Sequence, residues 1–388
     1  MKFSYILFFI LISHIGICDK YVWNMKAPFP SFARHRCAAF SIGNKGYMGI
    51  GHINSGGISD DYQDWWEFDP ATNSWSQKAD YPKNRYGTAT FVIGNKGYMG
   101  TGRKQGGPDQ QEFYEYDPIT NIWTQKTDFP IISGGNVGFS INNYGYMGLS
   151  TGVGLYKYDP IIDSWSAVTT TITADDYSSC FVINNKAYIQ PAYTNSLVMY
   201  DPATGLSTGK ANFIGLTRYG ACSFSLKNIG YVGLGAYLTD YKDFYYYDPV
   251  LDSWDTIPKA FPGVRRHYVP SFVIGDNAFF GTGTNGTNLG DMWGYEWKVS
   301  VGVSNIQNEN DIIIYPNSAH EFITISISEN NLIDNSVFKI FNLTGQEVLT
   351  QTIYTNKTLI DVKHISKGIY VYTLINSKKT ISKKIIIN

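Results

Sequence analysis

The sequence predicts an all-β protein with two parts, a closed six-bladed β-propeller over residues 19–300 and a small antiparallel β-sandwich over residues 311–388. Three observations predict it: a hairpin sequence that recurs six times, a longer aromatic unit that recurs between the hairpins, and a change of composition near residue 298. The overall composition agrees, because aromatic residues make up 16% of the chain and 38 residues are Gly, which is typical of strands joined by tight turns.

The first repeated unit is a predicted β-hairpin. Each copy has alternating apolar residues, a turn of Gly, Asn or Asp, and a second strand that begins with an aromatic residue, which is the pattern of two antiparallel strands joined by a tight turn. The six copies are SIGNKGYMGIG (41–51), VIGNKGYMGTG (92–102), SINNYGYMGLS (140–150), VINNKAYIQPA (182–192), SLKNIGYVGLG (225–235) and VIGDNAFFGTG (273–283).

The second repeated unit is an aromatic strand that runs into Asp-Pro, turns, and continues in a strand opened by Trp in four of the five copies. Pro fixes φ in the turn and the Asp side chain can hydrogen-bond the turn backbone, so we interpret these acids as turn-formers rather than catalytic or calcium-binding groups. Their spacing of 42 to 48 residues is the length of one four-stranded propeller blade. The five copies are WEFDPATNSW (66–75), YEYDPITNIW (114–123), YKYDPIIDSW (156–165), VMYDPATGLS (198–207) and YYYDPVLDSW (245–254), with Asp69, Asp117, Asp159, Asp201 and Asp248.

The count of units predicts how the ring closes. There are six hairpins but five Asp-Pro units, and no outer strand follows MWGYEW (292–297). The segment YVWNMKAPFP (21–30) matches WSQKADYP (75–82), so we expect it to supply the missing strand and to remove the free sheet edges. The Trp residues that repeat with the blades are expected in the core; they are Trp23, Trp75, Trp123, Trp165 and Trp254.

These repeats resemble the kelch family, which includes galactose-oxidase-like proteins. The likeness covers about 280 residues, and the YDP-x-x-x-x-W unit is its most specific element. Kelch repeats usually carry Gly-Gly after the second strand, whereas this chain has Met-Gly-x-Gly, Gln-Pro-Ala or Gly-Thr-Gly there. The resemblance implies the propeller fold. Galactose-oxidase-like enzymes hold copper with Tyr and His and cross-link a Cys to a Tyr, and because the Cys residues here lie inside the hairpins, we expect no cofactor.

The amino terminus predicts export. A basic start at Lys2, an apolar run over residues 5–17 and the small residues Gly16 and Cys18 fit a signal peptide over residues 1–18, cut after Cys18. The alternative is a lipoprotein site at Cys18. The run is too short for a membrane span, and no later segment is long enough, so we expect no transmembrane segment in the mature chain. The net charge of −1 argues against a nucleic-acid partner.

Three Cys remain after this cleavage, and their spacing matches no metal motif. Cys37, Cys180 and Cys222 each lie in a strand-like run, which favours buried free thiols. One disulfide and a spare thiol is the alternative.

The tail has a different composition, because all nine Trp precede residue 298. Residues 301–310 read as a polar linker, and the alternating strands beyond it predict the sandwich. The segments IIYPNS (313–318), FNLTGQEV (341–348), IDVKHISKGIYVYTL (360–374) and KKIIIN (383–388) resemble the C-terminal sorting domain of the type IX secretion system of Gram-negative bacteria. The family usually has Pro-Asn-Pro where this chain has Pro-Asn-Ser at 316–318.

The resemblance implies that the tail is recognised by the type IX machinery and that the protein is secreted or held at the outer-membrane surface. The Lys residues near the end also fit solvated charges that protect a sheet edge. The residues that the resemblance marks as the sorting signal are Pro316, Asn317, Gly345, Gly368, Lys383 and Lys384.

A candidate ligand site follows from the ring. The sixth residue before the first-strand Phe of each blade is Arg34, Arg85, Ser133, Asp175, Arg218 or Arg266, and the next is His35, Tyr86, Gly134, Asp176, Tyr219 or His267. Equivalent positions meet near one axis, so four guanidiniums are expected at the channel mouth, where they suit a carboxylate, sulfate or phosphate while Tyr or His stacks on a sugar. The predicted site is Arg34, His35, Arg85, Tyr86, Arg218, Tyr219, Arg266 and His267.

Other readings stay open. The arginines can instead be structural, bonding loop carbonyls or pairing with acids. His35 and His267 fall in neighbouring blades and can share a metal, but a third ligand is missing, so no metal site is predicted. Trp65 and Trp293 depart from the repeat position and are possible exposed sugar-stacking residues.

The sequence predicts a secreted binding module for an acidic glycan or a protein ligand. It contains no nucleophile elbow, zinc-protease helix, phosphate loop or dinucleotide fingerprint. The alternatives are an enzyme resembling the sialic-acid (N-acetylneuraminate) mutarotases, which are six-bladed kelch proteins, and a surface scaffold without a small-molecule ligand.

Overall fold

The structure is a computed structural model that describes residues 21–297 except 58, and residues 312–388 except 317, 328–335, 356 and 376–379. Two compact units, Met1–Lys298 and Val299–Asn388, make up the chain, and each is described by itself. The predicted signal peptide and linker lie outside the described residues. Within the described part there is no helix with the length and apolar character of a membrane span.

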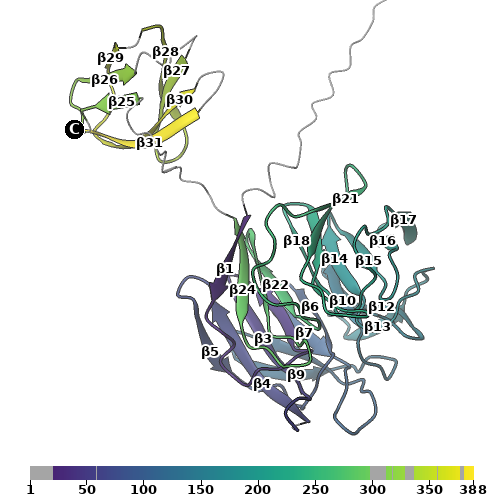
Figure 1. The fold of residues 1–388 in the computed structure, drawn as a ribbon. Helices are drawn as coiled ribbons and strands as arrows, with labels where there is room; N and C mark the ends of the chain where they lie inside the picture. The colour runs from purple at the N-terminus through teal and green to yellow at the C-terminus, as the bar shows by residue number, and fades with distance from the viewer. Residues whose placement is uncertain are drawn as a thin grey trace, which may run out of the picture. The chain divides into compact units, whose positions relative to one another are not determined.

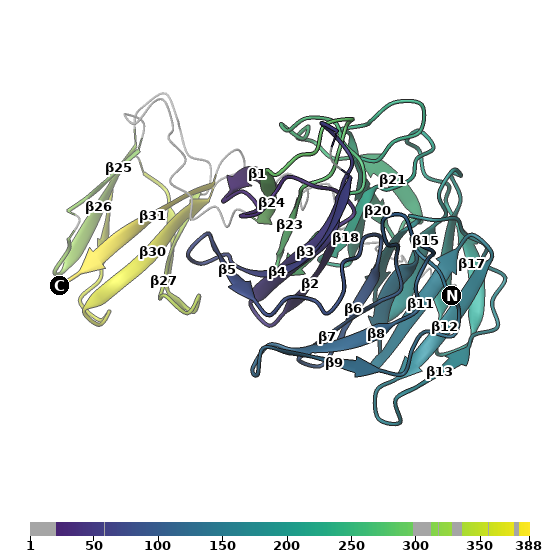
Figure 2. The same cartoon turned by 90° about the horizontal axis from the view of Figure 1, so that it is seen from below.

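The first unit is a propeller of six four-stranded antiparallel sheets, as predicted (Figure 1, and Figure 2 from below). Blade 1 comprises β2 (Ala38–Ile42), β3 (Lys45–Ile53), β4 (Asp60–Asp69) and β5 (Ser74–Lys78). Blade 2 comprises β6 (Ala89–Ile93), β7 (Lys96–Gly100), β8 (Phe113–Asp117) and β9 (Ile122–Lys126). Blade 3 comprises β10 (Val137–Ile141), β11 (Tyr144–Ser150), β12 (Val153–Asp159) and β13 (Ser164–Ala167).

The other three blades repeat this order. Blade 4 comprises β14 (Ser179–Ile183), β15 (Lys186–Gln190), β16 (Leu197–Asp201) and β17 (Leu206–Lys210). Blade 5 comprises β18 (Cys222–Leu226), β19 (Ile229–Gly233), β20 (Phe244–Asp248) and β21 (Ser253–Thr256). Blade 6 comprises β22 (Ser271–Ile274), β23 (Asn277–Gly281), β24 (Met292–Trp297) and, as its outer strand, β1 (Tyr21–Lys26).

The ends of the ring share blade 6, as the sequence predicted. Strand β1 pairs antiparallel with β24 from Tyr21 opposite Trp297 to Lys26 opposite Met292, and the two lie side by side in Figure 1. Trp23 lies opposite Tyr295, with ring centroids 4.3 Å apart. The paired strands close the ring, so the propeller has no open gap between its first and last blades.

Neighbouring blades pack closely because Gly sits beneath a Phe of the preceding blade. A Cβ added to Gly97 would lie 2.3 Å from Cζ of Phe40, and one added to Gly145 would lie 2.1 Å from the ring of Phe91. Side chains at these positions would therefore push the blades apart.

In four of the six blades, a repeated pair of hydrogen bonds, here called the clasp, joins the outer strand to the segment that follows the outer strand of the preceding blade. The indole N–H of Trp123 donates to the carbonyl of Ala79 at 3.0 Å, while the side-chain oxygen of Asn121 accepts the amide N–H of the same residue at 2.9 Å. The same pair of hydrogen bonds occurs three more times: Trp75 and Asn73 bond Ala27, Trp165 and Asp163 bond Thr127, and Trp254 and Asp252 bond Ala211. The constant spacing between the Asp-Pro turn and the Trp within this chain thus supports the contact between blades as well as the turn.

The Asp residues of the Asp-Pro units form turns, as predicted. The side chain of Asp69 accepts the amide N–H of Ala71 at 2.9 Å, and the other four acids accept the equivalent N–H. The suggestion that Trp65 and Trp293 are exposed is wrong, because Trp65 is 0% exposed and Trp293 is buried in blade 6.

The three described Cys residues are free thiols. Burial raises the pKa of Cys37 to about 11, although the charge of Arg34 opposes the shift. Burial also raises the pKa of Cys180 and of Cys222 well above the usual range. These thiols are therefore protonated and unreactive at neutral pH.

The second unit is an antiparallel sandwich of two sheets, as predicted. The first sheet has the order β25 (Ile312–Tyr315), β26 (Phe322–Ile327) and β29 (Lys357–Asp361). The second has the order β28 (Glu347–Ile353), β27 (Ser336–Phe341), β30 (Gly368–Ile375) and β31 (Thr380–Ile387). Ile323 and Ile325 of one sheet and Phe338, Ile340 and Leu374 of the other belong to a common apolar core.

Five of the six predicted sorting residues are described. Gly345 has φ +85° in the turn between β27 and β28, where its amide N–H donates to the carbonyl of Asn342 at 3.0 Å. Gly368 opens β30, Pro316 follows β25, and Lys383 and Lys384 are exposed on the edge strand β31. Asn317 lies outside the described residues.

Candidate ligand site at the channel mouth

The four predicted arginines lie inside the blades. Each is almost fully buried and pairs with an acid of its own blade, which lies directly before the third strand in three blades and within β4 in blade 1. In blade 6, Arg266 places Nη1 2.5 Å and Nη2 2.7 Å from the two carboxylate oxygens of Asp291. The other pairs are Arg34 with Asp64, Arg85 with Glu112, and Arg218 with Asp243.

These ion pairs account for the charge of the four arginines. Burial raises the pKa of Asp291, but the hydrogen bonds and charge of Arg266 outweigh burial and hold that pKa below its usual value. The same balance lowers the pKa of Asp64 beside Arg34. The guanidiniums also bond backbone: Arg266 donates from Nε to the carbonyl of Val264 at 3.1 Å. The expected convergence of four free guanidiniums at the channel mouth is therefore not what the structure shows, because each is satisfied within its blade.

A ring of backbone hydrogen bonds surrounds the propeller axis two residues beyond these arginines. One residue from each blade donates its amide N–H to the carbonyl of the equivalent residue in the preceding blade, at 2.8 to 3.3 Å. Because these residues directly precede the innermost strands, the ring lies at the channel mouth. We call it the axial ring; its members are Arg36, Gly87, Gly135, Tyr177, Gly220 and Tyr268.

All six members of the axial ring have positive φ, between 56° and 73°. A residue with a side chain is strained there by about 1–2 kcal/mol, whereas Gly is not. The glycines also leave room, since a Cβ on Gly87 would lie 2.8 Å from the hydroxyl of Tyr177 and one on Gly220 would lie 2.7 Å from the ring of Tyr268. Large side chains from three blades thus occupy space that Gly vacates in the others.

The three large side chains of the axial ring form one cluster. The guanidinium carbon of Arg36 lies 3.6 Å from the ring centroid of Tyr268 and 5.2 Å from that of Tyr177. The two tyrosine rings meet edge to face with centroids 4.6 Å apart. Burial raises the pKa of Tyr177 to about 12, against the lowering effect of the nearby arginines, so its hydroxyl stays neutral. The cluster places one cation against two aromatic faces at the axis.

Arg36 has no acidic partner among the described residues. Its Nε is buried without a hydrogen-bond acceptor, and Nη1 lies 3.1 Å from Nδ1 of His35. Burial and the charge of Arg36 lower the pKa of His35 to about 3, so the imidazole is neutral. Since Arg can only donate, Nδ1 of His35 accepts and Nε2 donates to Asn54 at 2.8 Å. Arg36 therefore keeps an uncompensated positive charge.

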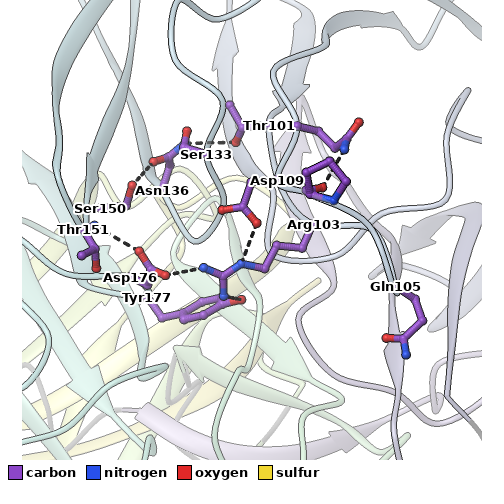
Figure 3. Close-up of polar contacts among 12 residues, drawn as sticks. Thr101, Arg103, Gln105, Asp109, Ser133, Asn136, Ser150, Thr151, Asp176 and Tyr177 are labelled. Atoms are coloured by element: carbon purple, nitrogen blue, oxygen red, sulfur yellow. Dashed lines mark hydrogen bonds and ion pairs between the residues drawn. The ribbon is translucent and has the colours of Figure 1, made fainter.

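Unlike Arg36, Arg103 on the same face of the propeller is paired with acids (Figure 3). Its Nε donates to Asp109 at 3.1 Å, Nη2 is paired with Asp176, and Nη1 lies 3.2 Å from the hydroxyl of Tyr177. The pairs with Asp109 and Asp176 neutralise Arg103. Its contact with Tyr177 helps to hold that ring in the cluster.

The second half of the predicted site surrounds the cluster. The centroid of Tyr219 lies 5.6 Å from that of Tyr268, and Tyr86 lies 5.7 Å from the guanidinium carbon of Arg36. His267 packs against Tyr268 at 4.4 Å, and its Nδ1 is 2.5 Å from Asp240. Because His35 uses both ring nitrogens in hydrogen bonds, it has no lone pair left for a metal shared with His267.

The channel below the axial ring is hollow and narrow. A cavity of about 140 Å³ is bounded by the axial ring and by the next residues of the inner strands, including Asn136 and Ser178. A second cavity of about 200 Å³ continues along the inner strands, lined by small residues such as Thr90, Cys180 and Ser223. Asn136 is fixed by hydrogen bonds to Thr101, Ser133 and Ser150 (Figure 3).

Sequence reasoning missed Arg36, although it stands two residues from a predicted site residue. A signal was present: the repeats read RHR (34–36), RYG (85–87), RYG (218–220) and RHY (266–268), so the third position is either Gly or a large residue. That alternation is typical of a backbone position with positive φ at a crowded axis.

Comparison with known proteins gave a match to a family model and a match to a solved structure. Residues 313–388 match the family model of the secretion system C-terminal sorting domain. Among curated proteins, no relative matches the chain. The solved structure of YjhT shares the fold, with a TM-score of 0.58 and 14% sequence identity, over 69% of this chain and 96% of that one. The chain thus combines a six-bladed propeller, the fold that it shares with YjhT, with a tail that matches a C-terminal sorting domain of secreted proteins.

Proposed function

We propose that this exported protein is a binding module that takes the acidic group of a glycan at the channel mouth, with Arg36 as the anion-binding residue. The sorting domain supports secretion through the type IX pathway. The propeller is then the part that acts outside the cell.

One observation carries the proposal: Arg36 is a cation that pairs with no carboxylate among the residues that the structure describes, and it is held at the axis between Tyr268 and Tyr177. A guanidinium in this setting gains most from a carboxylate or sulfate, which it can bind through two parallel hydrogen bonds. The positive φ of Arg36, at a position where Gly occupies three other blades, supports a role beyond folding.

The test compares galacturonate with galactose, which lacks the carboxylate, by calorimetric titration of the full chain and of Arg36→Gly. Gly is the natural choice because the axial ring already accepts it in three blades. We expect galacturonate to bind and galactose not to bind. The variant should lose roughly ten- to a hundredfold in affinity for galacturonate, which is the size expected for the loss of hydrogen bonds to a charged group.

The matched control is Arg265→Ala, which removes an exposed cation from the same face of the propeller. It should leave the affinity unchanged. Equal losses in both variants would assign the effect to net charge, and binding that survives Arg36→Gly would contradict the proposal. If galacturonate, N-acetylneuraminate and a sulfated sugar all fail to bind the native chain, the scaffold alternative is favoured.

A second candidate function is a mutarotase of acidic sugars, and the pair His267–Asp240 favours it. Burial lowers the pKa of His267, with partial opposition from Asp240, so the imidazole is neutral and able to accept a proton near pH 7. Asp240 orients the imidazole, because its Oδ1 lies 2.5 Å from Nδ1 of His267. In mutarotation His267 takes the proton of the anomeric hydroxyl as the ring C–O bond breaks, and a solvent water gives a proton to the ring oxygen. The protonated His267 then returns its proton to the hydroxide that remains, and closure on the other face reverses these steps.

Exchange NMR of N-acetylneuraminate separates the two functions. An enzyme raises the rate of exchange between anomers at catalytic protein concentration, and His267→Gln should lower that rate without abolishing binding. A binder leaves the rate at its uncatalysed value.

A further inference from the structure

We infer that the site extends from Arg36 across blades 4 to 6 as a track of four tyrosines that binds successive sugar rings of an acidic oligosaccharide. This inference rests on the proposed function and specifies its ligand. The track consists of Tyr268, Tyr219, Tyr193 and Tyr237, in order from the axis outward.

The four rings form an unbroken series. Tyr268 contacts the guanidinium of Arg36, Tyr219 lies 5.6 Å from Tyr268, Tyr193 lies 5.2 Å from Tyr219, and Tyr237 lies 6.3 Å from Tyr193, all between ring centroids. The residues come from loops that precede first strands or follow second strands. In an antiparallel blade both kinds of loop lie at the same end, which is the end that carries the axial ring.

The outer half of the track is not needed by the core. Tyr193 is 47% exposed and Tyr237 is 51% exposed, and neither side chain makes a hydrogen bond within the described residues. Tyr193 also has φ +63°, an unfavourable conformation for a residue with a side chain. Exposed aromatic rings in a continuous series, on a strained loop, are typical of a binding surface.

The track runs in one direction because the opposite side is closed. At the positions equivalent to Tyr193, blades 1 and 2 carry His52, paired with Asp61 at 2.8 Å, and Arg103, paired with Asp109 and Asp176 (Figure 3). Those side chains satisfy one another. The side of blades 4 and 5 presents ring faces and hydroxyls instead.

The chemistry suits a sugar chain with an acidic unit at the axis. A pyranose has an apolar face that gains from contact with an aromatic ring, and hydroxyls that bond the Tyr hydroxyls. Tyr offers this area at a low cost in conformational entropy. The guanidinium of Arg36 binds the carboxylate and so fixes which end of the chain lies over the channel.

The experiment measures affinity against chain length. The full chain is titrated with oligogalacturonates of one to six units, alongside Tyr237→Ala, Arg36→Gly and the control Tyr354→Ala, an exposed Tyr of the second unit. We expect the native affinity to rise with length, and Tyr237→Ala to weaken the longer oligomers by roughly three- to tenfold while leaving the single sugar unchanged. Arg36→Gly should weaken every length, and Tyr354→Ala none.

The outcomes separate the two proposals. Equal affinity for one and six units, or a Tyr237→Ala variant that binds all lengths as the native chain does, overturns the track and leaves the anion site standing. Binding that survives Arg36→Gly overturns the anion site. If no acidic oligosaccharide binds but an acidic peptide does, with the same dependence on Arg36, the sugar assignment is wrong.

Discussion

Arg36 and Tyr268 are joined twice across the closure of the propeller. The amide N–H of Arg36 donates to the carbonyl of Tyr268 at 3.3 Å, and the guanidinium carbon stacks 3.6 Å from the centre of the Tyr268 ring. The first contact closes the axial ring between blades 1 and 6, and the second holds the uncompensated cation of the candidate site. Closure of the fold and construction of the site therefore depend on the same pair.

Gly87→Ala tests the crowding of the axial ring. The new Cβ would meet the Tyr177 hydroxyl at 2.8 Å and adopt a strained φ of +62°, so we expect a loss of about 2 kcal/mol or more in the free energy of unfolding. Gly94→Ala is the matched control, because Gly94 has φ +57° with nothing near its Cβ position. Chemical denaturation measures both; equal losses would mean that strain alone matters.

Trp123→Phe tests the clasp between blades. The substitution keeps an aromatic ring but leaves the Ala79 carbonyl without the indole donor, which lies 3.0 Å away. We expect a loss of about 1–2 kcal/mol in the free energy of unfolding, from the hydrogen bond and the smaller ring. Asn121→Ala should produce a loss of similar size by removing the acceptor for the Ala79 amide. The double variant, in a mutant cycle, should show that the two losses are coupled.

Arg266→Ala tests the buried ion pairs. Removal of the guanidinium leaves Asp291 partly buried without its partner, so we expect a loss of about 3 kcal/mol or more and a clear fall in the melting temperature. Galacturonate affinity, measured below the melting temperature, should stay the same, because Arg266 is 0% exposed. A stable variant that no longer binds would restore Arg266 to the ligand site.

Acid should destabilise the propeller. The arginines hold the pKa of Asp64 and Asp291 below the unfolded value of about 4, although burial alone would raise it. A carboxylate whose pKa is lower in the folded state contributes stability that is complete above the unfolded pKa and is lost as pH falls through the folded one. Melting temperatures should therefore fall steeply below about pH 4.

Asp291→Asn provides the control for that titration. The variant should be less stable at pH 7, yet its melting temperature should depend less on pH below 4 because one linked proton is gone. A slope identical to that of the native chain would show that Asp291 does not contribute to the acid transition.

Much of the fold could be predicted because a propeller repeats its local signals. The hairpin turn recurs in all six blades, and the Asp-Pro turn and the Trp of the outer strand each recur in five; the surplus segment around Trp23 predicted its pairing with β24. The candidate site could be predicted from these repeats only in part. His35, Tyr86, Tyr219 and His267 lie near the axis, but the arginines beside them turn inward to acids about 25 to 30 residues away in sequence.

By itself the sequence determined the blade number, the closure by the first strand and the sorting tail, because each depends on patterns local in the chain. Only the tertiary structure decided which arginines pair with acids. Charge compensation depends on which carboxylates come within hydrogen-bond distance, and Arg34 and Arg36, two residues apart, differ because one side chain lies inside its blade beside Asp64 while the other stacks on Tyr268 at the axis. That difference is set by backbone direction and by contacts between blades, which no single repeat encodes.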